Sequence, residues 1–413
     1  MKKPENHVIT PEIVAPAGSE ESLAAALGAR ADAVYAGVSG FNMRAGAEPL
    51  DMTRIAEWTK RAHDAGAKLY LAMNVLVFDD ELEEAARILD RAVGAGVDAV
   101  ILWDAGLMDL AREREIPLHL STQASVANSR AAAMYETKGV RRIVLARELS
   151  LEHLRRTITA TRDRGSSLEF EAFVHGAMCV AVSGRCLTSQ FLYNRSANRG
   201  DCLQPCRRSY RVTDMRNGNE LTLDGHTVMS ARDLCTIDIA DRLVDAGVGA
   251  FKIEGRMRDA LYVKTTVECY REAREAAVAG TFDARLASSL KNRLERVFHR
   301  GFSSGFYLGP PDHDIAKEEG NLSSVVRSYA GRVLNYYPKA GAADVRLEAR
   351  GLALGDTLLV TGPTTGALEF EANSMRSEKN NPVEASEAGN VIGIATPERV
   401  REGDRVYVLD ERN

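Results

Sequence analysis

The hydrophobic pattern divides the chain into two parts. In the first part, short apolar runs alternate with longer amphipathic stretches; the runs lie at 12–15, 32–36, 68–73, 98–103, 117–121, 142–146 and 169–174. The stretch at 80–93 has apolar residues at helical spacing behind Asp79 and Asp80, either of which could cap a helix. Near-continuous apolar strands separated by amphipathic helices predict a parallel sheet covered by helices.

An eighth apolar run at 251–254 completes the set of strands that a barrel needs. The pattern therefore predicts an α/β fold, a (β/α)8 TIM-like barrel with a cysteine-rich insertion at about 175–235, after the seventh strand. A ninth strand candidate lies at 228–231. The alternative is an open doubly wound sheet, because periodicity alone does not show closure.

From about residue 325 the pattern changes to short alternating strands separated by glycine turns. Five or six strands in fewer than 90 residues predict a small C-terminal antiparallel β-barrel domain. We therefore expect a barrel at 1–310, a linker at 311–324 and a β-barrel domain at 325–413. Such modules often bind RNA, and a lid or a dimerisation module is the alternative.

Charge and apolar content bear on whether the protein binds nucleic acid or a membrane. The 53 basic and 58 acidic side chains give a formal net charge of -5, so binding to nucleic acid would have to depend on a local basic patch. No apolar run approaches the length of a membrane span, and no apolar segment follows the two lysines near the N-terminus. We expect a cytoplasmic protein that does not bind membranes.

Four of the six cysteines fall within the segment 175–208: Cys179, Cys186, Cys202 and Cys206. In a reducing compartment such a group indicates metal ligation or redox chemistry rather than disulfides. The spacing C-x6-C-x15-C-x3-C resembles a zinc knuckle only in its last pair, so an iron-sulfur cluster and zinc both remain open. Cys235 could replace one of the four ligands, whereas Cys269 lies in a helical pattern and is expected in the core.

Polar side chains follow the carboxyl ends of most predicted strands, and in a barrel these ends face one cavity. The residues are Asn42, Arg44, Asn74, Thr122, Gln123, Arg147, Glu148, His175, Lys252, Glu254 and Arg256. Arg147 and Glu148 could instead form only an ion pair on the rim. The cysteine segment adds several arginines and a single acid, Asp201.

Several long motifs resemble one known family. APAGSEESLAAALGARADAVYAG, FNMRA, STQASVANS, HGAMCVAVSGRC, NRSANRGDCLQPCR and FKIEGRMRDALYV are similar to signatures of the collagenase-like peptidase family, formerly of unassigned catalytic type. This family includes the prephenate-dependent tRNA uridine hydroxylases of TrhP type and the ubiquinone-biosynthesis hydroxylation factors of UbiU and UbiV type. The resemblance covers about residues 10–310. It implies a barrel-like fold, a 4Fe-4S cluster on the cysteine segment, and hydroxylation that does not take its oxygen from dioxygen.

The resemblance also assigns residues. The four cysteines of the segment match the family's cysteine motifs, and the sequence Gln204-Pro205-Cys206 resembles the tRNA type rather than the ubiquinone type. Residues 252–256 match the KIEGR motif. Asn42 and Arg44 match FNAR, with Met43 in place of alanine.

The function that these observations predict is a tRNA-modifying hydroxylase that forms 5-hydroxyuridine at the wobble uridine, with a 4Fe-4S cluster and prephenate as cosubstrate. The expected catalytic residues are His175, Lys252, Glu254 and Arg256. The expected substrate-binding residues are Asn42, Arg44, Asn74, Gln123, Arg185, Arg195 and Arg199. A dicarboxylate cosubstrate needs guanidinium partners, for which Arg44, Arg185 and Arg256 are the candidates by position.

The arginines of the segment have two interpretations. Arg195, Arg199, Arg207, Arg208 and Arg211 could contact tRNA phosphates around the cavity mouth. Alternatively, they neutralise the cluster or pair with acids.

Two other functions remain as alternatives. Against a collagenase-like peptidase, the chain has no H-E-x-x-H motif, and a cysteine that ligates a cluster cannot also be a free nucleophile. The other alternative is a non-catalytic, cluster-bearing partner of an oxygen-independent hydroxylase, in a homo- or hetero-oligomer.

Overall fold

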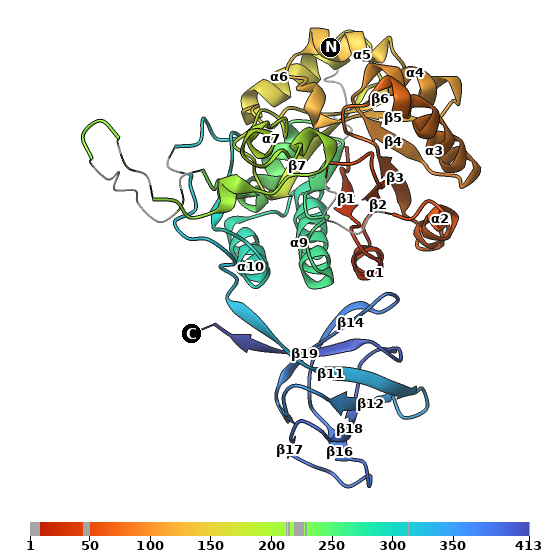
Figure 1. The fold of residues 1–413 in the computed structure, drawn as a ribbon, viewed down its shortest axis with the longest axis vertical. Helices are drawn as coiled ribbons and strands as arrows, with labels where there is room; N and C mark the ends of the chain where they lie inside the picture. The colour runs from red at the N-terminus through yellow and green to blue at the C-terminus, as the bar shows by residue number, and fades with distance from the viewer. Residues whose placement is uncertain are drawn as a thin grey trace.

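The computed structural model describes residues 9–43, 50–211, 213, 215–218, 227, 229–312 and 314–412. Its larger part is a closed parallel barrel surrounded by helices (Figure 1). The barrel strands are β1 (Glu12–Pro16), β2 (Ala33–Gly37), β3 (Lys68–Ala72), β4 (Ala99–Leu102), β5 (Leu118–Leu120), β6 (Val140–Val144), β7 (Glu169–Gly176) and β9 (Ala250–Ile253). Each pairs in parallel with the next, and β9 pairs in parallel with both β7 and β1. The sheet therefore closes, which confirms the predicted barrel over the open alternative.

Helices cover the outside of the barrel. They are α1 (Glu20–Gly28), α2 (Ile55–Asp64), α3 (Leu82–Gly94), α4 (Ala105–Glu113), α5 (Ser129–Glu136), α6 (Leu151–Arg162), α8 (Ala240–Asp245), α9 (Ala260–Val278) and α10 (Ala284–Glu295). The predicted helix at 80–93 begins slightly later than expected, because Asp79–Glu81 forms a 3-10 turn and α3 starts at Leu82. Cys269 is buried in α9, as the helical pattern predicted.

The inside of the barrel holds aromatic side chains and a buried ion-pair network. Arg142 bonds Glu12 at 2.6 Å and Glu171 at 3.4 Å, and Lys252 bonds Glu171 at 2.5 Å. The Tyr70 hydroxyl donates to Glu12 at 2.9 Å. Since buried charges are stable only when they are paired, this network constrains which side chains the barrel interior can accept.

The insertion between β7 and β9 contains α7 (Thr188–Tyr193) and one further strand, β8 (Asp233–Cys235). The predicted ninth strand at 228–231 is wrong in position: Met229, Ser230 and Ala231 lie outside any strand, and Val228 lies outside the described residues. Leu234 and Cys235 are buried, and β8 pairs antiparallel with the end of β7. β8 is buried because it pairs with β7, which is distant in sequence. The apolar pattern of the insertion therefore does not predict where this strand lies.

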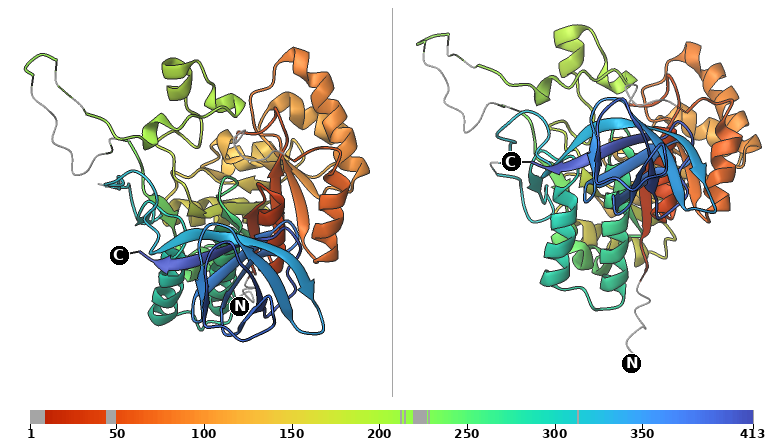
Figure 2. Two further views of the ribbon diagram at one scale, coloured as in Figure 1. Left: turned by 60° about the horizontal axis from the view of Figure 1, so that its bottom comes forward. Right: turned by 90° about the horizontal axis from the view of Figure 1, so that it is seen from below.

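The C-terminal part is an antiparallel β domain with its own apolar core. Its seven main strands are β11 (Val325–Tyr337), β12 (Ala342–Leu347), β14 (Thr357–Gly362), β15 (Gly366–Glu371), β16 (Met375–Ser377), β18 (Val391–Ala395) and β19 (Arg405–Glu411), in the order β15-β14-β19-β11-β12-β18-β16. Three short strands are separate from this sheet: β13 (Leu352–Ala353) pairs with β17 (Ala385–Ser386), and β10 (Phe302–Ser303) pairs with β8 of the barrel. In Figures 1 and 2 the blue β domain packs against the barrel beside α1 and α9. Within the described part of the chain, no helix is both long enough and apolar enough to cross a membrane.

Candidate active site

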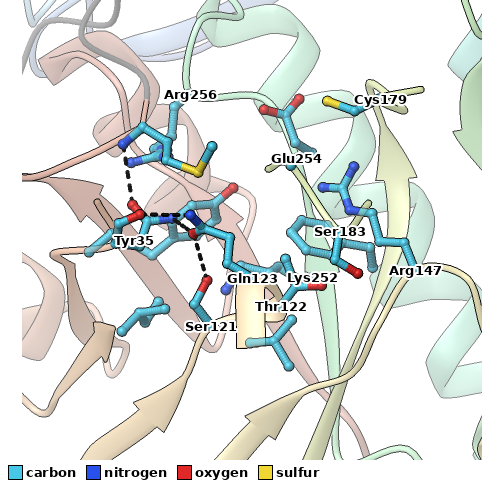
Figure 3. Close-up of a pocket in the computed structure, with 17 residues that line it drawn as sticks. Tyr35, Ser121, Thr122, Gln123, Arg147, Cys179, Ser183, Lys252, Glu254 and Arg256 are labelled. Atoms are coloured by element: carbon cyan, nitrogen blue, oxygen red, sulfur yellow. Dashed lines mark hydrogen bonds between the residues drawn. The ribbon is translucent and has the colours of Figure 1, made fainter. Parts of the chain in front are cut away.

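A cavity lined by many polar side chains lies at the carboxyl end of the barrel strands and opens to solvent (Figure 3). Side chains from most of the strands and from the cysteine segment line it: Tyr35, Met43, Asn74, Ser121, Thr122, Gln123, Arg147, Phe173, Cys179, Ser183, Lys252, Glu254 and Arg256. In the view of Figure 3, Cys179 and Arg147 lie on the right and Arg256 and Tyr35 on the left. Five residues predicted for the site are thus brought together with a cysteine of the segment.

Lys252 is a buried cation in the wall of this cavity. Its ammonium group bonds the Glu171 carboxylate at 2.5 Å and lies 4.6 Å from the ring centroid of Tyr35. Burial lowers the pKa of Lys252 below its usual value, and the Glu171 carboxylate acts in the opposite direction. The carboxylate and the ring together fix where this amine stands.

Arg256 is held in place by Asn42. The Asn42 side chain donates to the Val38 carbonyl at 2.6 Å, and its oxygen accepts from Arg256 Nη1 at 3.2 Å. Asn42 is buried and does not itself line the cavity. It therefore acts on the site by positioning Arg256. Glycine is required beside this pair, because a Cβ atom at Gly37 would lie 2.4 Å from Asn42 Cγ and 2.6 Å from Arg256 Nη1.

Asn74 and Gln123 form a fixed amide pair in the cavity wall, and Gln123 lies beside Tyr35 in Figure 3. Asn74 Nδ2 donates to Gln123 Oε1 at 2.8 Å, and Gln123 Nε2 donates to the Asn74 carbonyl at 2.9 Å. Ser121 Oγ also donates to Gln123 Oε1, at 3.0 Å. These bonds hold the wall rigid and use most of the hydrogen-bonding capacity of the two amides.

Arg147 separates this cavity from a second, more apolar one. Its guanidinium lies 3.8 Å from the ring centroid of Phe173, and Nη1 donates to the Ala177 carbonyl at 2.9 Å. Within the described residues, Arg147 Nε is buried without a hydrogen-bond partner. Arg147 and Cys179 line both cavities, while Met178 and Phe306 belong to the second.

Glu148 does not serve as the ion-pair partner of Arg147. Both of its carboxylate oxygens accept from Ser183, one from the backbone N–H at 2.6 Å and one from Oγ at 2.5 Å. Ser183 has a φ of 34°, which is unfavourable for a residue with a side chain. Glu148 therefore anchors a strained turn between Cys179 and Cys186.

The four cysteines of the segment are free thiols and are partly exposed. Burial raises the pKa of the Cys206 thiol; Arg207 lowers it, and Cys179, Cys202 and Cys186 raise it further. Cys179, Cys186 and Cys202 thus lie near enough to Cys206 to act on its thiol electrostatically. In the part of the chain that the structure covers, no three His, Cys, Asp or Glu side chains are arranged around a single metal ion.

Cys235 lies apart from this group. It is buried on β8, 3.8 Å from the Tyr270 hydroxyl, and burial raises its pKa to about 11. A buried thiol with a raised pKa resists the deprotonation that metal ligation requires. Cys235 is a core residue in this structure.

His175 is also buried and is not among the residues that line the cavity. Its ring packs against Tyr270 and Tyr262, and its Nδ1 lies 3.4 Å from the Tyr270 hydroxyl. Burial lowers the pKa of His175 to about 3, so the ring is neutral at physiological pH. The structure gives His175 a packing position between β7 and α9.

Arg185, Arg195 and Arg199, which were also predicted to bind substrate, lie outside the cavity. Arg185 is exposed and donates to Ser125 Oγ at 3.0 Å. Arg195 pairs with Asp201 at 2.8 Å, and Arg199 Nη1 bonds the Glu81 carboxylate at 2.8 Å. Arg44 lies outside the described residues.

Sequence reasoning missed Tyr35, Ser183 and Glu171 as parts of the site. Tyr35 and Glu171 sit within apolar strand runs, where an inward-facing side chain cannot be told from an outward-facing one when both faces are buried. Arg147 was predicted as a residue at a strand end. Its position between the two cavities was not predicted, because it depends on packing against Phe173, which is distant in sequence.

Comparison with known proteins places the chain among relatives of several named activities. Residues 18–317 match Peptidase family U32. Uncharacterized protease MJ0090 of Methanocaldococcus jannaschii is 40% identical over 405 residues, covering 97% of this chain and 98% of that protein. A collagenase of Porphyromonas gingivalis is 39% identical over 412 residues, with 97% and 98% covered. tRNA hydroxylation protein P1 of Bacillus subtilis is 30% identical over 383 residues, with 91% and 89% covered.

The family match spans most of the barrel and the cysteine segment, and the three relatives match nearly their whole lengths. The resemblance expected from the sequence motifs is confirmed: this chain belongs to peptidase family U32.

Proposed function

We propose that this protein is a tRNA-modifying hydroxylase that forms 5-hydroxyuridine at the wobble uridine. In this proposal the protein carries a 4Fe-4S cluster and uses prephenate as its cosubstrate. The observation that carries the proposal is the position of Cys179, whose thiol lies in the wall of the cavity that also holds Lys252, Glu254 and Arg256. The name of the Bacillus subtilis relative supports the same activity.

The donor set suits an iron-sulfur cluster. Four partly exposed cysteine thiols in one segment match the donor set of a 4Fe-4S cluster, which takes one thiolate at each iron. Cys179, Cys186, Cys202 and Cys206 would hold it, and once bound it would supply electron transfer at the cavity wall. Arg207, which donates to the Ser230 hydroxyl at 3.2 Å, would offset part of its negative charge.

The charge of the cavity suits a small dicarboxylate. Arg147, Lys252 and Arg256 contribute three cations, while Glu254 is the acid among the lining residues. Because Glu171 already neutralises Lys252, the two guanidinium groups are the better partners for carboxylates, and guanidinium can bind each carboxylate through two hydrogen bonds. The Nε atom of Arg147, buried without a partner among the described residues, is a donor available to such a ligand.

A uridine in an RNA chain reaches such a cavity only when its base leaves the stack. The rigid amide pair of Asn74 and Gln123 would form one wall beside the base. Glu254 lies on the side of the cavity nearer Cys179 in Figure 3, where its carboxylate would exchange a proton with the bound substrate. The proposed role of the cationic groups is to bind and orient the cosubstrate.

The test of this function is the nucleoside content of tRNA from cells that lack the protein. We expect 5-hydroxyuridine derivatives to disappear, to return with the wild-type gene, and to stay absent with Glu254→Gln. The Arg30→Gln variant, at an exposed position after α1 that does not line the cavity, should restore them fully. Unchanged levels in the deletion strain would refute the proposal.

The names of the Methanocaldococcus jannaschii and Porphyromonas gingivalis relatives favour a peptidase as the second candidate. In the cavity wall the Ser183 hydroxyl contacts the Glu148 carboxylate, but Glu148 binds the Ser183 backbone as well and Ser183 is buried. This geometry suits a turn anchor better than a nucleophile. Peptidase activity is tested by digestion of casein or collagen with the wild-type protein, and the Ser183→Ala and Cys179→Ala variants are the controls.

A non-catalytic role in a larger hydroxylase is the third candidate. Purified cluster-loaded protein, incubated anaerobically with tRNA and prephenate, should form product by itself if the chain is the enzyme. Product that appears only after a second protein is added would assign the chemistry elsewhere.

A further inference from the structure

The short helix α7 presents hydrophobic side chains to solvent. Phe191 is 82% exposed, Leu192 57% and Tyr193 39%. Single exposed hydrophobic residues are common on protein surfaces, but several adjacent ones mark an interaction site. In Figure 2 (left) α7 is the yellow-green helix that protrudes from the barrel, away from the blue β domain.

A cation lies on one of these rings. The guanidinium carbon of Arg208 is 4.9 Å from the ring centroid of Tyr193, and Nη1 donates to the Tyr193 hydroxyl at 2.8 Å. Arg208 is itself exposed. The arrangement holds a positive charge and an aromatic face side by side at the surface.

The surface around α7 keeps part of its positive charge. Arg195 and Arg199 are neutralised by Asp201 and Glu81. The partners that the structure gives Arg185 and Arg208 are hydroxyl oxygens, which leave the charge in place. An anionic partner is therefore favoured over an uncharged one.

The segment that carries α7 also forms part of the cavity wall. Ser183 and Gly184 line the cavity wall, Cys186 follows, and α7 begins at Thr188. The α7 helix thus follows the cavity wall after only three further residues of the chain.

We propose that Phe191, Tyr193 and Arg208 form a stacking surface for unpaired nucleotides next to the uridine that enters the cavity. Aromatic rings stack on any base, and arginine binds phosphate, so this combination is typical of proteins that bind single-stranded nucleic acid. The inference rests on the proposed function, since it assumes an RNA substrate. In this proposal α7 binds the nucleotides of the RNA that remain outside the cavity.

The test compares two neighbouring variants, Phe191→Ala and Leu192→Ala. Affinity for a tRNA transcript and for its anticodon stem-loop is measured by filter binding with cluster-loaded protein. We expect Phe191→Ala to weaken binding by about tenfold, since stacking on one base has an effect of this order. Leu192→Ala, which removes apolar area from the same helix but no ring, should change affinity less than twofold, and Phe191→Trp should bind at least as well as wild type.

A third variant tests the charge. Arg208→Gln should lower the slope of log affinity against log salt concentration by about 0.7, the value for one contact to a single-stranded phosphate. Iron content is measured for each variant. If Phe191→Ala loses iron, the comparison rests on Phe191→Trp and Arg208→Gln.

Unchanged affinity in Phe191→Ala, or equal losses in Phe191→Ala and Leu192→Ala, would overturn the inference; equal losses would indicate an apolar docking surface for another protein. Failure of the proposed function has a different signature. If tRNA from the deletion strain keeps its 5-hydroxyuridine derivatives, the function fails, whereas the effect of Phe191 on RNA binding is still measured directly.

Discussion

Lys252 Nζ and Glu171 Oε1 lie 2.5 Å apart inside the barrel, where the Lys252 side chain is 5% exposed and that of Glu171 is fully buried. Glu171 also bonds Arg142 at 3.4 Å. One carboxylate thus holds two cations, and one of these cations forms part of the cavity wall. The position of Lys252 in the candidate site depends on a residue that does not touch the cavity.

Replacing Glu171 should destabilise the protein strongly. Glu171→Gln leaves Lys252 buried without a counter-charge, and removal of one partner of a buried pair costs about 3–5 kcal/mol. Glu169→Gln is the matched control, because Glu169 also bonds Arg142 but its side chain is 56% exposed. We expect that control to lose less than about 1 kcal/mol in urea unfolding. Similar losses in both variants would contradict the interpretation.

The Lys252 pair should also make stability depend on pH. Burial lowers the pKa of Lys252 in the folded protein below its usual value of 10.5, so in that range the unfolded chain binds more protons than the folded one. The free energy of unfolding of wild type, relative to that of Lys252→Met, should therefore rise as the pH rises towards 10.5. A relative stability that stays flat or falls over this window would show that Lys252 titrates normally.

Gly37 should be essential for the position of Arg256. In Gly37→Ala the new Cβ would lie 2.6 Å from Arg256 Nη1 and 2.4 Å from Asn42 Cγ, so the guanidinium must move. We expect affinity for prephenate, measured by calorimetry, to fall about tenfold, which corresponds to about 1.4 kcal/mol. Gly94→Ala, where the added Cβ meets nothing within 4 Å, is the control and should bind normally.

The cysteines should separate into two classes by iron analysis. Alanine at Cys179, Cys186, Cys202 or Cys206 should abolish cluster loading after anaerobic reconstitution. Cys235→Ala should keep its iron and sulfide and lose only stability, because Cys235 is a buried thiol beside Tyr270. Loss of iron in Cys235→Ala, with retention in one of the other four variants, would reassign the ligand set.

Gly366 should control how the β domain packs on the barrel. It has a φ of +69°, and a Cβ atom there would lie 2.7 Å from the backbone nitrogen of Ala25 in α1. Gly366→Ala should loosen this contact and raise the rate of proteolysis between the barrel and the β domain. Gly389→Ala has a similarly positive φ with no atom within 4 Å, so it carries the backbone strain without the clash. Equal proteolysis rates would show that the clash is accommodated.

Much of the fold could be predicted because each strand and helix has its own local pattern. The strand predictions at 12–15 and 169–174, for example, fall within β1 and β7. The position of β8 could not be predicted, because its burial comes from pairing with β7 rather than from a repeat within the insertion.

The candidate site was predictable in part for the same reason. Residues at strand ends, such as Asn74 and Lys252, could be assigned to the cavity because parallel strands end at one face. His175 also ends a strand, and the structure turns its ring away into the packing between β7 and α9.

The sequence by itself determined that parallel strands alternate with helices, that the polar strand ends share one face, and that four cysteines lie in one insertion. These properties follow from periodicity and spacing, which are local. Closure of the sheet into a barrel was seen only in the pairing of β9 with β1 and β7. Only the tertiary structure decided that Glu171 pairs with Lys252, that Arg147 stacks on Phe173, and that Arg199 is neutralised by Glu81. Such pairings join residues that are distant in the chain, and they depend on how the barrel closes and where the insertion folds back over it.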